Sequence, residues 1–421
     1  MTETVDVSAL RVGMFVHLDV GWMAHPFPLS SFKIASADQI RTIQGLGLQR
    51  VRWSPERSDP PPEATPPLPA VATVEQPAEE VVDPAEQARR EQAARLAAQL
   101  AAMRQCDRQF NEACRDLRRL HDAVALDPLR ARDSAQQLTR AMLEKMLVEG
   151  ELCVRVLSEP HGDRHTAHAM NVAVVSLLLA RVLGFKPEEL QELGTGALLH
   201  DIGKLELPYR QRLLRDDFTT PELAHYREHV AMGVSHGRRM QLSPTAMLVI
   251  AQHHELADAT GYPTGVGLDK IAPAARVVAM VNHYDNLCNA ATIARSLTPH
   301  EALSRMFAQA RGKFDAVMLN AFIRLMGIYP PGSLVQLSDD RYAMVMSVNS
   351  ARPLKPRVLV FDPGVSSEQA LHLNLELVPD LGIRRSLRSD QLPGRAVDYL
   401  APRQRVTYYF DVENAPEQET V

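Results

Sequence analysis

The chain has 421 residues, 45% of them hydrophobic, and a formal net charge of −5 without any basic cluster, so we expect no nucleic-acid polymer as a partner. Its four cysteines lack CxxC spacing, which argues against a disulfide framework or a cysteine zinc site. With neither a signal-peptide pattern nor an apolar run long enough to span a membrane, we expect a cytoplasmic protein.

The N-terminal third is predicted to contain three parts. Residues 1–57 resemble a small β-rich module, because "MFVHLDV" alternates and turn-like segments follow it. Residues 58–84 hold eight prolines and are predicted to be a linker. Residues 85–157 are predicted to be a long helical region, beginning with one helix over about 85–122 that is rich in Ala, Arg, Gln and Glu.

The helix over 85–122 allows two interpretations. Residues at alternating steps of four and three resemble a coiled-coil seam with one polar break: Leu96, Leu100, Met103, Asp107, Phe110, Cys114 and Leu117. We favour packing against the helix's own domain, because that arrangement is more common. The alternative is a homodimer through this helix. A signalling partner protein is a separate candidate partner of the chain.

The rest of the chain changes from helical to β-rich. Residues 158–329 have helical periodicity almost throughout, with short Gly/Pro breaks. Residues 330–412 change to a period of two, as in "LHLNLELV" (371–378), "RVLVF" and "VTYYF". We therefore predict a mainly α protein with a helical bundle core and small β-rich N- and C-terminal segments.

Histidines concentrate in the helical region, where 11 of the 15 fall between His161 and His300. Buried ionisable groups need partners, because desolvation costs several kcal/mol. Imidazole and carboxylate donors without thiolate suit Fe, Mn, Zn or Ni, and two such ions form the usual clamp for phosphoryl hydrolysis. The polar residues that lie within or end these apolar helical runs are His165, His168, His200, Asp201, Lys204, His229, His253, His254, Asn282 and Asp285.

Two motifs carry a resemblance to a known family. "HDIGK" (200–204), followed by Pro208, and "HHELADATGYPTG" (253–265) resemble the signatures of the HD-GYP branch of the HD superfamily of metal-dependent phosphohydrolases. The similarity covers about 158–329. Near the start, "GMFVHLDVGWMAHPFPLSSFKI" resembles a small domain of unknown function that often precedes HD-GYP domains in proteobacteria.

The resemblance implies an HD-type all-helical bundle and a cyclic di-GMP phosphodiesterase that forms linear pGpG and, in some members, GMP. It also implies two divalent metal ions, with iron or manganese preferred and zinc or nickel as alternatives. Asp201 would bridge the two ions, and Lys204 would touch the scissile phosphate. The metal ligands implied by position are His168, His200, Asp201, His229, His253, His254 and Asn282, with His165 as a competitor for the place of His168.

Three departures from the family pattern bear on activity. Asn282 stands where the family has an aspartate ligand; an amide carries no charge, although Asp285 on the same helical face could partly substitute. Arg164 stands where members with a third metal have a glutamate, so we expect two metals at most. The Arg-Pro-Tyr segment that helps hold the dinucleotide in the family is missing.

Two alternatives to the enzyme therefore stay open. One is a degenerate HD-GYP module that binds metal, nucleotide or a partner protein without catalysis, and Asn282 is its main support. The other is an HD phosphohydrolase with a different nucleotide substrate, which the Gly261-Tyr262-Pro263 element disfavours.

Overall fold

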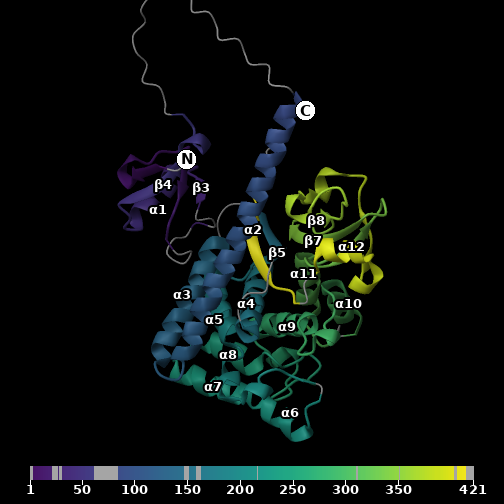
Figure 1. Ribbon diagram of the computed structural model, residues 1–421. Coiled ribbons are helices and arrows are strands. Elements are labelled where there is room, and N and C mark those ends of the chain that lie inside the picture. The colour runs from purple at the N-terminus through teal and green to yellow at the C-terminus, as the bar shows by residue number, and fades with distance from the viewer. Residues whose placement is uncertain are drawn as a thin grey trace, which may run out of the picture. The chain divides into compact units, whose positions relative to one another are not determined.

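The computed structural model divides the chain into two compact units, Met1–Ala101 and Ala102–Val421 (Figure 1). Most of the predicted linker over 58–84 lies outside the described residues. None of the described helices is long and apolar enough to cross a membrane. The structure describes residues 3–20, 27, 31–60, 84–146, 151–157, 163–215, 217–309, 312–349, 351–402 and 405–413.

The first unit contains a four-stranded antiparallel sheet with the order β1-β4-β2-β3. One helix, α1 (Ala37–Gly45), begins at Ser36, whose side chain caps it, and contributes Ile43 to a small core with Val16 and Ile34. The predicted β-rich character of this segment is confirmed, with one helix added. The strands are β1 (Glu3–Asp6), β2 (Phe15–His17), β3 (Ser31–Lys33) and β4 (Arg50–Ser54).

The long predicted helix is α2 (Pro84–Ala123), which α3 (Pro128–Met146) follows. Within the second unit, Phe110 and Leu117 are fully buried, and the ring of Phe110 meets that of Tyr409 edge-on at 6.1 Å. This part of α2 therefore packs on its own unit, as we favoured. Pairing between two copies of the chain stays a prediction.

The helical core of the second unit confirms the mainly α prediction (Figure 1). Helix α4 is buried from Ala169 to Ala180 and packs against α5 and α9, while α5 packs against α8. The helices are α4 (Arg164–Val182), α5 (Pro187–Leu199), α6 (Thr220–Arg227), α7 (His229–Arg239), α8 (Pro244–Gln252), α9 (Pro273–Cys288), α10 (Pro299–Gln309) and α11 (Ala316–Met326).

A seven-stranded sheet accompanies this core, with the order β10-β6-β7-β5-β11; β8 also pairs with β7, and β9 pairs with β8. The short helix α12 (Gly394–Leu400) precedes β11. The predicted β-rich C-terminal segment is confirmed. Its strands are β5 (Glu151–Val156), β6 (Leu334–Leu337), β7 (Tyr342–Asn349), β8 (Arg357–Val360), β9 (Leu373–Asn374), β10 (Ile383–Leu387) and β11 (Tyr408–Glu413).

Two local predictions need correction. Residues 151–156, which we placed in the helical region over 85–157, form β5, which is stabilised by pairing with β7 and β11. Residues 371–378 alternate, yet only Leu373–Asn374 are a strand and Leu375–Leu377 form a 3-10 turn. The Asn374 side chain accepts a hydrogen bond from the Glu376 backbone N–H, so it caps a turn where we expected a strand.

Candidate functional site

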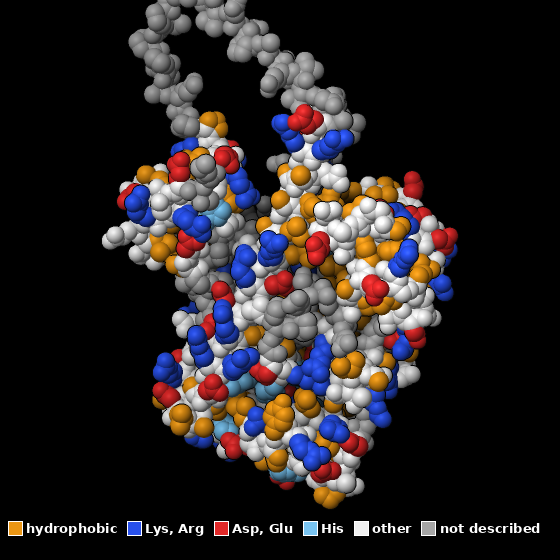
Figure 2. Space-filling model, in the orientation of Figure 1, with side chains coloured by type: hydrophobic (Ala, Val, Ile, Leu, Met, Phe, Trp, Pro, Cys, Tyr) orange, Lys and Arg blue, Asp and Glu red, His pale blue; other side chains and the backbone are white. Residues whose placement is uncertain are grey.

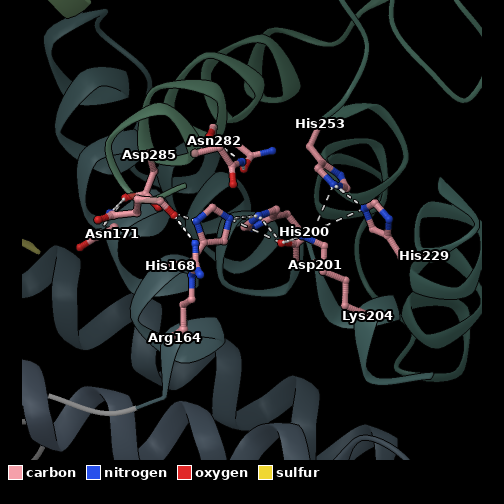
Figure 3. A network of polar contacts seen from close by, with 12 residues as sticks. Arg164, His168, Asn171, His200, Asp201, Lys204, His229, His253, Asn282 and Asp285 are labelled. Carbon is pink, nitrogen blue, oxygen red and sulfur yellow. Dashed lines mark hydrogen bonds and ion pairs between the residues drawn. The ribbon is translucent and has the colours of Figure 1, made fainter. Parts of the chain in front are cut away.

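Asp201 lies at the centre of a buried cluster of histidines, just beyond the end of α5 (Figure 3). Its Oδ2 atom lies 3.4 Å from Nε2 of His200 and 3.5 Å from Nε2 of His168. Its Oδ1 atom lies 3.5 Å from Nε2 of both His229 and His253. One carboxylate therefore faces two pairs of imidazoles, one pair on each oxygen.

Backbone carbonyls orient three of these four rings. In His200, His229 and His253, Nδ1 lies 2.6 to 2.8 Å from the carbonyl oxygen three residues earlier in the chain. Because Nδ1–H donates there, a neutral ring keeps its Nε2 lone pair for the cluster. The Nε2 atoms of His229 and His253 lie 3.4 Å apart. Two lone pairs at this distance favour a cation between them.

The other pair is formed by His168 and His200, whose Nε2 atoms lie 3.3 Å apart. Burial lowers the pKa of His168, but hydrogen bonds to Asp201 and to Asp285, whose Oδ2 lies 2.6 Å from Nδ1, outweigh burial and raise the pKa to about 9. Burial holds the pKa of His200 at about 4 and that of His229 at about 3, so both rings are neutral near pH 7. His168 therefore carries a proton on Nε2, the atom that faces Asp201, and a divalent cation could bind there in place of the proton.

Lys204 forms a buried ion pair with Asp201, with Nζ 2.6 Å from Oδ2. Burial by itself would raise the pKa of Asp201, but the Lys204 ammonium and His200 hold it well below its usual range. The Oδ1 atom of Asp201 is buried and has no hydrogen-bond partner among the described residues. An ionised oxygen without a donor, facing two imidazole nitrogens, fits a metal ligand.

The Gly261-Tyr262-Pro263 element lies against the histidines on the Oδ1 side of Asp201. The ring of His254 stacks on that of Tyr262 at 4.4 Å, and its buried Nε2 has no hydrogen-bond partner in the described part of the chain. Glu255 closes this loop, because its carboxylate accepts hydrogen bonds from the N–H groups of Thr264 at 2.7 Å and Val266 at 3.2 Å. Donor atoms within 4.8 Å of one another form two groups that share Asp201: His168, His200 and Asp201, and Asp201, His229, His253 and His254.

Asn282 and Asp285 lie one turn apart on α9 and have different surroundings (Figure 3). The buried Oδ1 atom of Asn282 accepts a hydrogen bond from Asn286 at 2.7 Å. Asp285, which we considered as a partial substitute for the missing carboxylate ligand, is in neither group of converging donors. It lies on the Nδ1 side of His168, away from Asp201, and its Oδ1 accepts hydrogen bonds from Asn171 at 2.8 Å and Asn289 at 2.9 Å.

His165 is in neither of the two groups of converging donors, and its ring lies 5.4 Å from that of His121. It lines a pocket that opens to solvent beside Asp201 and Lys204. The sequence prediction missed Asn171, Asn289 and Arg405. The pocket is lined by Arg164, His165, Ala167, His168, Asn171, Asp201, Lys204, Leu213, Leu214, Tyr226, Asp285, Asn286, Asn289, Ala291, Arg405, Val406 and Thr407.

Gly203 lets the HDIGK segment approach α7 closely. A Cβ atom there would lie 1.9 Å from the backbone oxygen of His229 and 2.4 Å from the nitrogen of Gly233. We expect Gly203→Ala to lower the free energy of unfolding by about 2 kcal/mol, because the backbones would have to separate. Urea unfolding checks this, with Gly394→Ala as the control, since no atom of the described residues lies within 4 Å of its added Cβ. An unchanged midpoint for Gly203→Ala would contradict the prediction.

Two family models match this chain. The domain of unknown function DUF3391 matches residues 2–135, and an HD domain matches residues 154–318.

Charged side chains of both signs are interspersed on the face shown in Figure 2.

Curated relatives cover the chain to different extents. The "Cyclic di-GMP phosphodiesterase PA4108" of Pseudomonas aeruginosa is 30% identical over 403 residues, which are 94% of this chain and 92% of the relative. The "Cyclic di-GMP phosphodiesterase PdeB" of Borreliella burgdorferi is 22% identical over 55% of this chain and 62% of the relative. The "3'3'-cGAMP-specific phosphodiesterase 2" of Vibrio cholerae is 25% identical over 37% of this chain and 30% of the relative.

Proposed function

We propose that this chain, which belongs to the HD-GYP family of HD-domain phosphodiesterases, hydrolyses cyclic di-GMP to linear pGpG. The reaction would use two divalent metal ions. The observation that carries the proposal is Asp201, whose two oxygens each face a pair of imidazole nitrogens at 3.4 to 3.5 Å. A bridging carboxylate between two nitrogen-rich sites is the arrangement that two-metal phosphoesterases need. The similarity to PA4108 over 94% of the chain supports the cyclic di-GMP substrate.

We assign the ligands from the two groups of converging donors. His168, His200 and Asp201 would hold one ion, and Asp201, His229, His253 and His254 the other, with the Oδ1 atom of Asn282 as a further, weaker ligand. Nitrogen and carboxylate donors without sulfur favour iron or manganese, with zinc or nickel as alternatives. Bound ions would supply Lewis acidity to the phosphate and activate a water molecule for attack.

The protein groups have separate tasks in this proposal. Lys204 would bring a positive charge to the scissile phosphate from the pocket side of Asp201. The backbone carbonyls behind His200, His229 and His253 would keep each Nε2 lone pair directed inward. We place the reaction in the cytoplasm, which the four buried, free cysteines support.

A second candidate is a degenerate module that binds a nucleotide or a partner protein without catalysis. Asn282 favours it, because an uncharged amide is a weaker metal ligand than a carboxylate. A different cyclic dinucleotide also has to be tested, since one relative is named as specific for 3'3'-cGAMP.

The deciding experiment is anaerobic purification of the full chain, metal quantification, and incubation with cyclic di-GMP and 3'3'-cGAMP, with products followed by chromatography. About two ions per chain and formation of pGpG support the proposal. Two ions without pGpG would indicate another substrate or a binding role. Absence of both metal and product would favour the degenerate module.

Asn282→Asp is expected to raise turnover by about 10-fold at limiting metal, because a charged ligand would replace a neutral one. Titration of the metal-free protein with Mn²⁺, followed by activity and by bound metal, measures the effect. Asn320→Asp on the exposed side of α11 is the matched control, since it adds the same charge elsewhere on the second unit. If Asn282→Asp changes neither metal retention nor rate, Asn282 does not contact a metal.

A further inference from the structure

The pocket beside Asp201 has one wall from outside the helical core. Arg405, Val406 and Thr407 precede β11 in the C-terminal segment and line the same pocket as Arg164 and Lys204. The HD-domain match ends at residue 318, so these residues lie beyond it. The pocket therefore combines the histidine cluster with a segment that the family match does not include.

Two asparagines fix this wall to the core. The carbonyl of Val406 accepts hydrogen bonds from Nδ2 of Asn171 on α4 at 3.0 Å and of Asn289 at 2.9 Å. The N–H of Val406 donates to Oδ1 of Asn289 at 2.9 Å, and the N–H of Tyr408 donates to Oδ1 of Asn171 at 3.0 Å. Four hydrogen bonds thus hold the backbone directly after Arg405 in place against the helical core.

Neither arginine of the pocket forms an ion pair with a carboxylate of the described residues, although the charge of Asp285 acts on Arg164 at longer range. Arg164 donates to the backbone carbonyls of Ala291 and Asn289, which orient its guanidinium. Arg405 is half-buried and has no hydrogen bond or ion pair with any described residue. Guanidinium groups with spare donors in a pocket favour a phosphate or carboxylate ligand.

A cyclic dinucleotide has two phosphodiester groups, and only one can lie at Asp201 and Lys204 for cleavage. The other must be held elsewhere in the pocket. We propose that Arg405, beside Arg164, binds the phosphate that is not cleaved, so that the C-terminal segment selects a cyclic dinucleotide over a simple phosphodiester. This inference rests on the proposed function.

The test compares cyclic di-GMP with bis(p-nitrophenyl) phosphate, which has one phosphate only, as substrates of the Mn²⁺-loaded full chain. For Arg405→Ala, the ratio of kcat/KM for cyclic di-GMP to kcat/KM for the small diester should fall by about 10- to 30-fold. Arg405→Lys should recover part of that ratio, because it keeps the charge but loses the bidentate geometry. Arg395→Ala, an exposed arginine on α12, is the matched control and should leave the ratio unchanged.

An unchanged ratio in Arg405→Ala, with an active wild type, overturns the inference and leaves the proposed function standing. An equal loss on both substrates also overturns it, because that pattern indicates damage to the shared metal site. If the wild type does not cleave cyclic di-GMP, the proposed function is wrong. The inference is then tested by measuring the binding of cyclic di-GMP by calorimetry. Weaker binding of cyclic di-GMP by Arg405→Ala than by wild type then supports it, and equal or absent binding overturns it.

Discussion

Asp201→Asn is expected to reduce turnover of cyclic di-GMP by about 1,000-fold or more and to lower bound metal from about two ions to one or fewer. The substitution keeps the shape of the side chain but removes the charge that faces both histidine pairs. One amide oxygen cannot replace two carboxylate oxygens, each 3.4 to 3.5 Å from two imidazole nitrogens. Metal analysis and product chromatography on the same preparation measure both effects.

A second variant separates loss of metal from loss of stability. Asp201→Asn leaves the buried Lys204 ammonium without its ion-pair partner, which could cost about 3–5 kcal/mol. In the double variant Asp201→Asn/Lys204→Met, an apolar side chain of similar length replaces the ammonium and should restore the melting temperature but not the metal. Asp269→Asn, at an exposed carboxylate, is the control for charge alone. Two retained ions in Asp201→Asn, with turnover within about tenfold of wild type, would refute the bridging role.

Asp285→Ala is expected to lower turnover by about 100-fold, although this carboxylate lies on the far side of His168 from the cluster. Its removal releases Nδ1 of His168, so that ring can rotate away from Asp201. It also takes away the shared acceptor of Asn171 and Asn289, which hold the C-terminal segment. Bound metal should fall mainly at the site formed by His168 and His200, leaving about one ion per chain.

Asp285→Asn is the conservative partner of this variant. Its amide oxygen can still accept a hydrogen bond from His168, so we expect a loss of about 10-fold. Thermal unfolding of both variants shows whether the core is intact. If Asp285→Ala binds two ions and turns over cyclic di-GMP like wild type, then the orientation of His168 does not depend on this carboxylate.

The parts of the fold and the site that depend on short motifs and on local composition could be predicted from the sequence. "HDIGK" and "HHE" end apolar helices, and helix ends place His200 and His253 where the carbonyl three residues earlier orients each ring. Their convergence on Asp201 could be anticipated because buried ionisable groups need partners. The helix over about 85–122 was likewise predictable from its composition.

The contacts of the C-terminal segment could not be predicted in this way. Asn171 and Asn289 resemble ordinary polar positions on helices, but their partner Val406 lies 235 and 117 residues further along the chain. Hydrophobic periodicity along the chain does not indicate a contact between residues so far apart. The same holds for β5, whose six residues are a strand because β7 and β11 flank them.

The position of β5 in the sheet limits how this protein can be divided. Its two neighbours, β7 and β11, both come from the C-terminal segment, so a fragment ending near residue 330 would leave β5 with two open edges. The smallest exchangeable module is therefore the whole unit Ala102–Val421 rather than the helical domain over 158–329. Gene fusions or domain swaps that treat the helical part as an interchangeable cassette should be designed around this larger piece.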